Sequence, residues 1–237
     1  MPRKTEFPIV YEDKECLVVV KREKLLTIKT NDPKTFARNL YHQVYEYLLQ
    51  KRERPFIVHR LDFETSGLLI FAKNLSLKER LQKALEERRV LRLYEGVIRE
   101  SLPLHQQFQT EMTLIENKNS FRVFKNKNGK QAITLFESRA HLNLGTAMKI
   151  QILTGRKNQI RLSCLENGWT LVGDERYAKD KAKRMYLNCY ALSFPEDCGL
   201  RESSFFLPPL WLGPDDGKPI VLSSPKKGPS RLRGKEG

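Results

Sequence analysis

The sequence HRLDFETSGLLIFA, which spans residues 59–72, places a polar turn between two apolar segments. Residues 56–58 lead into the turn and residues 68–72 lead out of it, and both segments are typical of short buried strands. The turn contains an imidazole, a guanidinium, two carboxylates, two hydroxyls and a glycine. A buried polar group without a partner costs roughly 1–3 kcal/mol. These side chains therefore form either a functional site or a polar network that holds the turn.

Asp62 is the candidate functional group of this turn. Gly67 can adopt backbone angles that other residues resist, and the hydroxyls of Thr65 and Ser66 can hydrogen-bond back to the main chain. Such a turn would fix Asp62 where the two strands diverge.

The composition predicts a polyanionic partner. The chain has 237 residues, 40% of them hydrophobic, which suffices for one large domain with tails, and its formal net charge is +15. A charge of this size favours a nucleic acid as partner. It is equally consistent with a basic protein that binds nucleic acid only incidentally, so the motifs must decide.

The cysteines and the apolar segments predict a cytoplasmic protein. Cys16, Cys164, Cys189 and Cys198 show no C-x-x-C spacing, so we expect reduced, mostly buried thiols and no zinc site. The sequence shows no signal peptide and no apolar run long enough for a membrane span.

A family resemblance sharpens this picture. Residues 59–67 resemble the H-R-L-D-x-x-T-S-G signature of the RluA-type pseudouridine synthases, which isomerise uridine in rRNA or tRNA. The resemblance implies that Asp62 is the catalytic nucleophile. It covers roughly residues 8–206, and we expect no appended N-terminal RNA-binding (S4-like) module before Pro8.

Two further motifs complete the implied catalytic set. Tyr94, two positions after the basic residue Arg92, resembles the second family motif, in which the basic residue is usually lysine. Residues 155–161 read GRKNQIR and resemble the third motif, G-R-x-H-Q-I-R, whose final arginine, Arg161 here, pairs with the catalytic aspartate in the family. We therefore expect Asp62, Tyr94 and Arg161 to converge in one cleft, where Arg161 would favour the ionised carboxylate.

Besides Arg92, this sequence departs from the family pattern at three places. Asn158 and Asn188 stand where histidine is usual, and the proline that usually follows the early lysine, Lys21 here, is missing. Roles that depend on those side chains cannot be transferred to this chain.

The resemblance also implies the ligands. We expect RNA as the partner, no cofactor, no metal and a monomer. The residues expected to bind RNA are His59, Arg60, Thr65, Arg92 and Arg156. The target uridine would be flipped out of its stack, at a cost of a few kcal/mol. Attack by Asp62 on the base, attack on the sugar and a glycal route all remain open.

The predicted fold class is α+β, with a long mixed, mainly antiparallel sheet flanked by helices and a central catalytic cleft. We expect a catalytic domain over residues 7–210 and a basic, disordered tail rich in Gly, Pro and Ser over residues 213–237. Helices are predicted to start at Asp32-Pro33 and at Ser76. A hairpin turn is predicted at Asn128-Gly129.

One alternative function remains open. The two replacements of histidine by asparagine allow a catalytically inactive RNA-binding or ribosome-assembly factor on the same fold. Retention of Asp62, Tyr94 and Arg161 together favours the enzyme.

Overall fold

The computed structural model describes residues 6–30, 35, 38–117 and 123–222. Within them the chain forms two compact units. The N-terminal unit comprises the residues up to Val90 together with 188–207, and the C-terminal unit comprises 91–187 together with the residues from Pro208 onward. No helix of the described part is both long and apolar enough to cross a bilayer.

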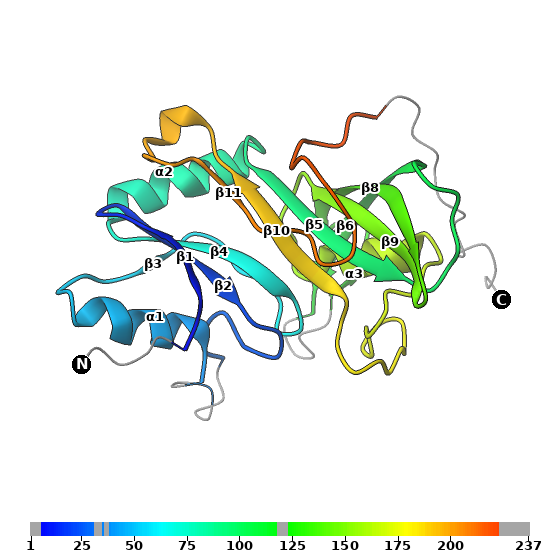
Figure 1. The fold of residues 1–237 in the computed structure, drawn as a ribbon, viewed down its shortest axis with the longest axis horizontal. Coiled ribbons are helices and arrows are strands. Elements are labelled where there is room, and N and C mark those ends of the chain that lie inside the picture. Colours follow the sequence, from blue (N-terminus) through cyan, green and yellow to red (C-terminus); the bar gives the residue numbers. More distant parts are fainter. Residues whose placement is uncertain (1–5, 31–34, 36–37, 118–122, 223–237) are drawn as a thin grey trace. The chain divides into compact units, whose positions relative to one another are not determined.

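The N-terminal unit is built on β2 and β4, whose side chains are almost all buried. Strand β4 pairs with β2 and β3 in antiparallel orientation and with β10 in parallel, while β1 pairs with β2 and β11 pairs with β10. The helices α1 and α2 flank these strands (Figure 1). The elements are β1 (Ile9–Glu12), β2 (Cys16–Lys21), α1 (Leu40–Leu49), β3 (Phe56–Ile57), β4 (Ser66–Ala72), α2 (Leu75–Glu86), β10 (Leu187–Ser193), the 3-10 helix η2 (Glu196–Cys198) and β11 (Ser204–Phe206).

The helix start predicted at Ser76 was wrong, and both α1 and α2 are capped by an asparagine. Helix α1 begins at Leu40, because the Asn39 side chain accepts a hydrogen bond from the His42 amide at 2.9 Å. Helix α2 begins at Leu75, because the Asn74 side chain accepts from the Leu77 amide at 2.8 Å. Asparagine is as good an N-cap as aspartate or serine. Asp32 and Pro33 lie outside the described residues.

The C-terminal unit is an antiparallel sheet with strand order β5-β9-β8-β6-β7. Helix α3 packs on β6 and β8, and Trp169, which follows this helix, meets Phe108 and Phe136 edge-on. The elements are β5 (Leu91–Ile98), β6 (Gln107–Glu116), β7 (Val123–Lys125), β8 (Lys130–Leu142), β9 (Gly145–Ile152) and α3 (Gln159–Glu166).

Asn128-Gly129 does form a turn, in which the Gly129 amide donates to the Asn126 carbonyl at 2.9 Å. The predicted hairpin was wrong, however, because β7 and β8 both pair with β6 and not with each other. The middle of the chain is still a run of antiparallel strands.

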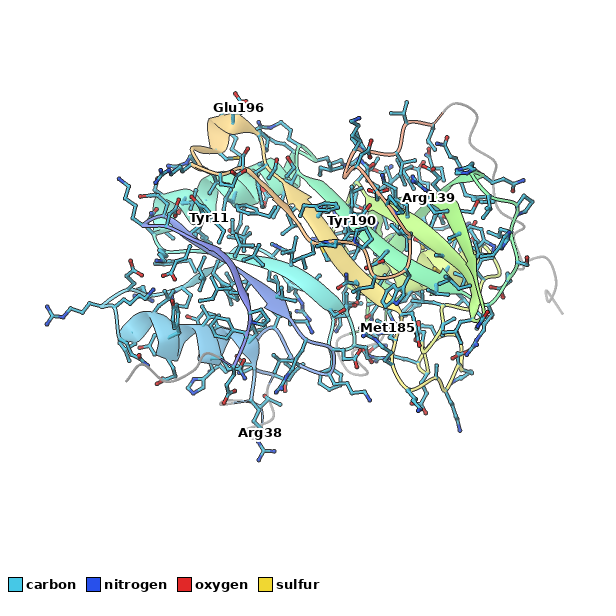
Figure 2. The ribbon with its side chains drawn as sticks, in the orientation of Figure 1. Tyr11, Arg38, Arg139, Met185, Tyr190 and Glu196 are labelled. Atoms are coloured by element: carbon cyan, nitrogen blue, oxygen red, sulfur yellow. The ribbon has the colours of Figure 1, made fainter. Side chains whose placement is uncertain are left out.

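The segment from Pro208 to residue 222 is held against the sheet of the C-terminal unit. Buried Glu95 accepts hydrogen bonds from the amides of Leu210 and Trp211, and Asp215 pairs with Lys149 at 2.9 Å and with Arg139, the β8 residue labelled in Figure 2. Residues 213–222 of the predicted tail take part in these contacts, and the disorder predicted for residues 213–237 stays a prediction. Residues 223–237 lie outside the described part.

The predicted fold class is confirmed. The structure is α+β, its strands form mixed, mainly antiparallel β-structure, and helices flank them. The four cysteines are free and buried, as expected.

Candidate active site

The turn that carries Asp62 lies between β3 and β4 and is fixed by main-chain hydrogen bonds on both sides. Before it, the buried Thr27 hydroxyl donates to the Leu61 carbonyl at 2.8 Å and accepts from the Leu61 amide at 3.2 Å. After it, the Thr65 amide donates to the Asp62 carbonyl at 3.2 Å. The carboxylate of Asp62 therefore projects from a backbone with little freedom to move.

Lys21, the last residue of β2, connects this turn to the loop that follows β2. Its side chain is fully buried, and its ammonium donates to the carbonyls of Leu25 at 2.6 Å, Arg22 at 3.0 Å and Phe63 at 3.2 Å. Burial lowers the pKa of Lys21 to about 8, although the nearby carboxylates of Asp62 and Glu64 act to raise it. A buried cation thus faces the candidate nucleophile from within its own unit.

The lowered pKa of Lys21 predicts a pH-dependent stability. Between pH 8 and the usual lysine value of 10.5, the folded protein has released a proton that the unfolded chain still holds, so a rise in pH favours the folded state. We expect the free energy of unfolding to increase by about 2 kcal/mol from pH ~7 to ~9.5 relative to a Lys21→Met variant. Urea denaturation of both proteins at both pH values measures this difference. A difference that does not change with pH would show that the pKa is not lowered.

Gly67 is the second residue of β4, the strand that leaves the turn, and its geometry requires glycine. Its φ is +117°, and a Cβ atom would lie 2.1 Å from the Cys189 carbonyl oxygen. The adjacent Ser66 hydroxyl donates to the Asn188 side-chain oxygen at 2.9 Å. Asn188, which occupies a position where histidine is usual, therefore has a defined structural role in fixing β10 beside the turn.

Arg161 lies on α3, buried with a specific partner. Its guanidinium makes a two-point ion pair with the buried Asp174 carboxylate, with Nη2–Oδ1 at 2.6 Å and Nε–Oδ2 at 3.0 Å. It also lies over the Tyr177 ring, 5.0 Å from the ring centroid. Asn158 donates to the Tyr177 hydroxyl at 2.9 Å, and its side-chain oxygen faces Arg161 Nη1 at 3.4 Å. The planar guanidinium is thereby held in one orientation.

Gln159 fixes the turn that leads into α3. Its side-chain oxygen accepts from the Thr154 hydroxyl at 2.7 Å and from the Arg156 amide at 3.0 Å, and its amide group donates to the Ile133 carbonyl on β8 at 2.9 Å. This buried network attaches the start of α3 to the sheet and so determines where Arg161 lies.

Tyr94 and Arg92 are both buried on β5. Tyr94 stands opposite Ile150 on β9 and is 5% exposed. The guanidinium of Arg92, also 5% exposed, lies so close to Gly155 that a Cβ atom there would be 2.7 Å from Nη1. Arg92 is therefore packed against the start of the third motif and is not part of the open surface.

The other residues expected to bind RNA differ in exposure. Arg60 and Arg156 are exposed, His59 is half-buried, and Thr65 is buried in the turn. Asp62 belongs to the N-terminal unit, and Tyr94 and Arg161 belong to the C-terminal unit. Their convergence in one cleft and the RNA-binding roles stay predictions.

Sequence reasoning missed the residues that hold the predicted groups in place. Lys21 and Gln159 appeared only inside family motifs, while Thr27 and Asp174 were given no role. What these four residues share is a polar side chain that is almost completely buried. The sequence does not show this burial, which becomes visible only in the fold.

Comparisons with known proteins agree on one family. The family model described as RNA pseudouridylate synthase matches residues 15–166. The dual-specificity RNA pseudouridine synthase RluA of Pasteurella multocida is 30% identical over 213 residues, which are 85% of this chain and 92% of that protein. The ribosomal large subunit pseudouridine synthase D of Buchnera aphidicola is 29% identical over 187 residues, which cover 78% of this chain but only 59% of that protein. The solved structure of human RNA pseudouridylate synthase domain containing 1 superposes with a TM-score of 0.69 at 25% identity, covering 86% of this chain and 84% of that one.

Proposed function

Since the chain belongs to the RNA pseudouridylate synthase family and is of the RluA type, we propose that it isomerises specific uridines in rRNA or tRNA to pseudouridine. The observation that carries this proposal is the rigid turn of Asp62. The main chain on both sides of the aspartate is hydrogen-bonded, and a buried cation lies close to it. A rigid main chain and a nearby buried cation support a catalytic role for Asp62.

The reaction makes and breaks few bonds. The glycosidic bond from N1 of uracil to C1′ of ribose breaks, the base turns, and a bond from C5 to C1′ forms. The hydrogen at C5 leaves as a proton and N1 gains one, so the product is an isomer and no electrons are gained or lost overall.

In the proposed mechanism Asp62 is the nucleophile and acts on a uridine that has been flipped from its stack. Attack on the base, attack on the sugar and formation of a glycal each use one carboxylate at this position. Arg161 would stabilise the charge of Asp62, and Asp174 holds Arg161 in one orientation. Tyr94 would stack on the base. A buried tyrosine suits an apolar contact with the ring.

A release assay tests the proposed activity. RNA transcribed with uridine carrying tritium at C5 loses the label to water when pseudouridine forms. We expect the purified chain to release tritium from its target RNA without an added nucleotide. Retention of the label in total rRNA and total tRNA alike would contradict the enzyme assignment.

Two asparagines favour a second candidate, a catalytically inactive RNA-binding or ribosome-assembly factor on the same fold. Asn158 and Asn188 replace family histidines, but each makes a hydrogen bond to a neighbouring side chain, Tyr177 and Ser66 respectively. Their structural roles are compatible with either function. In the release assay the inactive factor would bind RNA and release no tritium.

RNA binding should depend steeply on salt, because the +15 chain would displace condensed cations from the phosphates. We expect the dissociation constant to rise by at least about 10²-fold between ~50 and ~200 mM salt. Fluorescence anisotropy with labelled tRNA measures it. An affinity that does not change with salt would mean that the positive charge makes no phosphate contacts.

A further inference from the structure

The segment from Gly173 to Arg184, called the basic loop below, closes on itself beside the Arg161 network. Its two ends meet, because Gly173 has φ +80° and a Cβ atom there would lie 1.8 Å from the Arg184 carbonyl oxygen. Just outside the loop, the Tyr186 amide donates to the Val172 carbonyl at 2.9 Å. A compact surface loop whose ends are adjacent is an Ω-loop, a form often used for function.

Asp180 clamps the loop from inside. Its carboxylate accepts from the amides of Gly173 at 2.9 Å and Ala182 at 3.1 Å, and it pairs with Arg99 Nε at 2.7 Å. The hydrogen bond from Arg99 lowers the pKa of Asp180 to about 2, so the clamp stays charged at every physiological pH. Its negative charge is largely neutralised by Arg99.

The outer surface of the loop is cationic. Arg176, Lys179, Lys181 and Lys183 are all exposed within eight residues, and Glu175 is the exposed acid beside them. Met185, labelled in Figure 2, is buried immediately after the loop and anchors its end. A rigid loop that presents several cations loses little conformational entropy when it binds an anion.

The same carboxylate that holds Arg161 also shapes the first turn of the loop. Asp174 Oδ1 accepts from the amides of Arg176 and Tyr177, each at 3.1 Å, as well as from Arg161. The Asp174 carbonyl accepts from the amides of Ala178 and Asp180. The exposed cations are thus attached, through the buried Asp174, to the arginine that is proposed to stabilise the charge of Asp62.

We propose that the basic loop binds the sugar–phosphate backbone of the substrate RNA beside the reacting uridine. This inference rests on the proposed function and adds a binding element to it. Contacts of lysine and arginine with phosphates position a nucleic acid without reading its sequence. The loop therefore contributes to the affinity for RNA in general, while the choice of uridine is made elsewhere.

A charge-matched comparison tests the loop. The triple variant Lys179→Gln, Lys181→Gln, Lys183→Gln removes three charges from it. The control triple Lys14→Gln, Lys83→Gln, Lys127→Gln removes three exposed charges from the β1–β2 turn, from α2 and from the turn before β8. With fluorescein-labelled total tRNA at about 150 mM salt, we expect the loop triple to bind at least about tenfold more weakly than the wild type. Its salt slope should fall by about 2–3, and the control triple should lose less than about threefold. Equal losses in the two triples would overturn the inference.

Replacing Asp180 distinguishes the effect of the loop's geometry on RNA binding from the effect of net charge. Asp180→Ala makes the protein more positive and releases Arg99, so charge alone predicts tighter RNA binding. The inference predicts binding at least about threefold weaker, because the cations lose their fixed positions. Tighter binding by a variant with wild-type circular dichroism would overturn it. If Asp180→Ala does not fold, the two lysine triples decide, since their substitutions are on exposed side chains.

The activity assay separates failure of this inference from failure of the proposed function. At saturating RNA, the loop triple should release tritium at the wild-type rate, while its half-saturating RNA concentration rises about tenfold. If the wild-type protein releases tritium but the loop triple has an unchanged half-saturating RNA concentration, the inference about the loop is overturned and the proposed function stands. Wild-type protein that neither binds RNA nor releases tritium would overturn both.

Discussion

Replacing Asp62 with asparagine should reduce the rate of pseudouridine formation by at least about 10³-fold, because an amide has neither the charge nor the nucleophilicity of the carboxylate. The shape of the side chain is retained, and the turn around it is held by main-chain groups and by Thr27 and Lys21, which the substitution leaves in place. RNA affinity should change by less than about twofold, since the positive charge is spread over many residues. Single-turnover tritium release and fluorescence anisotropy measure the two quantities.

The matched control for this variant is Asp197→Asn. Asp197 lies in η2 of the same unit, where its exposed carboxylate pairs with Arg89. The control should keep full activity. If Asp62→Asn were as active as Asp197→Asn, the nucleophile would have to be sought elsewhere.

Replacing Asp174 with asparagine should have the largest effect on stability. Asp174 and Arg161 are each at least 97% buried and share two hydrogen bonds, so loss of the Asp174 charge would leave a buried guanidinium without its ion-pair partner Asp174. Removing one partner of a buried ion pair costs about 3–5 kcal/mol. We expect a loss of this size in the free energy of unfolding, measured by urea denaturation, together with a large loss of activity as Arg161 loses its fixed orientation.

Asp197→Asn also serves as the control for stability. It breaks an arginine–carboxylate pair too, but at the surface, where such pairs contribute little. Equal destabilisation by the two variants would contradict the assigned role of Asp174. A variant Asp174→Asn that is destabilised but fully active would mean that the ion pair holds the fold and not the chemistry.

Much of the fold could be predicted from the sequence, because local patterns determine it. The apolar runs around residues 56–72 and the alternation of apolar and polar residues over 107–153 predict strands that the structure contains. The helix starts could not be predicted reliably, since several residues near each start can act as caps. Asn74, for example, is as good a cap as Ser76, two residues later.

The supporting groups of the candidate site could not be predicted, for a different reason. Lys21 and the turn of Asp62 lie about forty residues apart, and their contact depends on β2 pairing with β4 in one particular register. The burial that lowers the pKa of Lys21 comes from the same packing. Asp174 likewise acquires its role only because the chain after α3 turns back towards Arg161. Local sequence carries none of this information.

The contacts of residues 213–222 have a similar cause. The composition from Gly213 onward is rich in glycine, proline and charged residues and is typical of disorder. Asp215 nevertheless pairs with Lys149 and Arg139, which lie far from it in the sequence. Such contacts become visible only in the fold, and the disorder of the tail stays a prediction.

The most direct test of the central claim, that this chain makes pseudouridine in RNA, is a map of pseudouridines in total rRNA and total tRNA from cells with and without the gene. The account predicts that at least one pseudouridine disappears on deletion, returns when the wild-type chain is expressed, and does not return with Asp62→Asn. An unchanged map would contradict the account, and so would a site restored equally by both proteins.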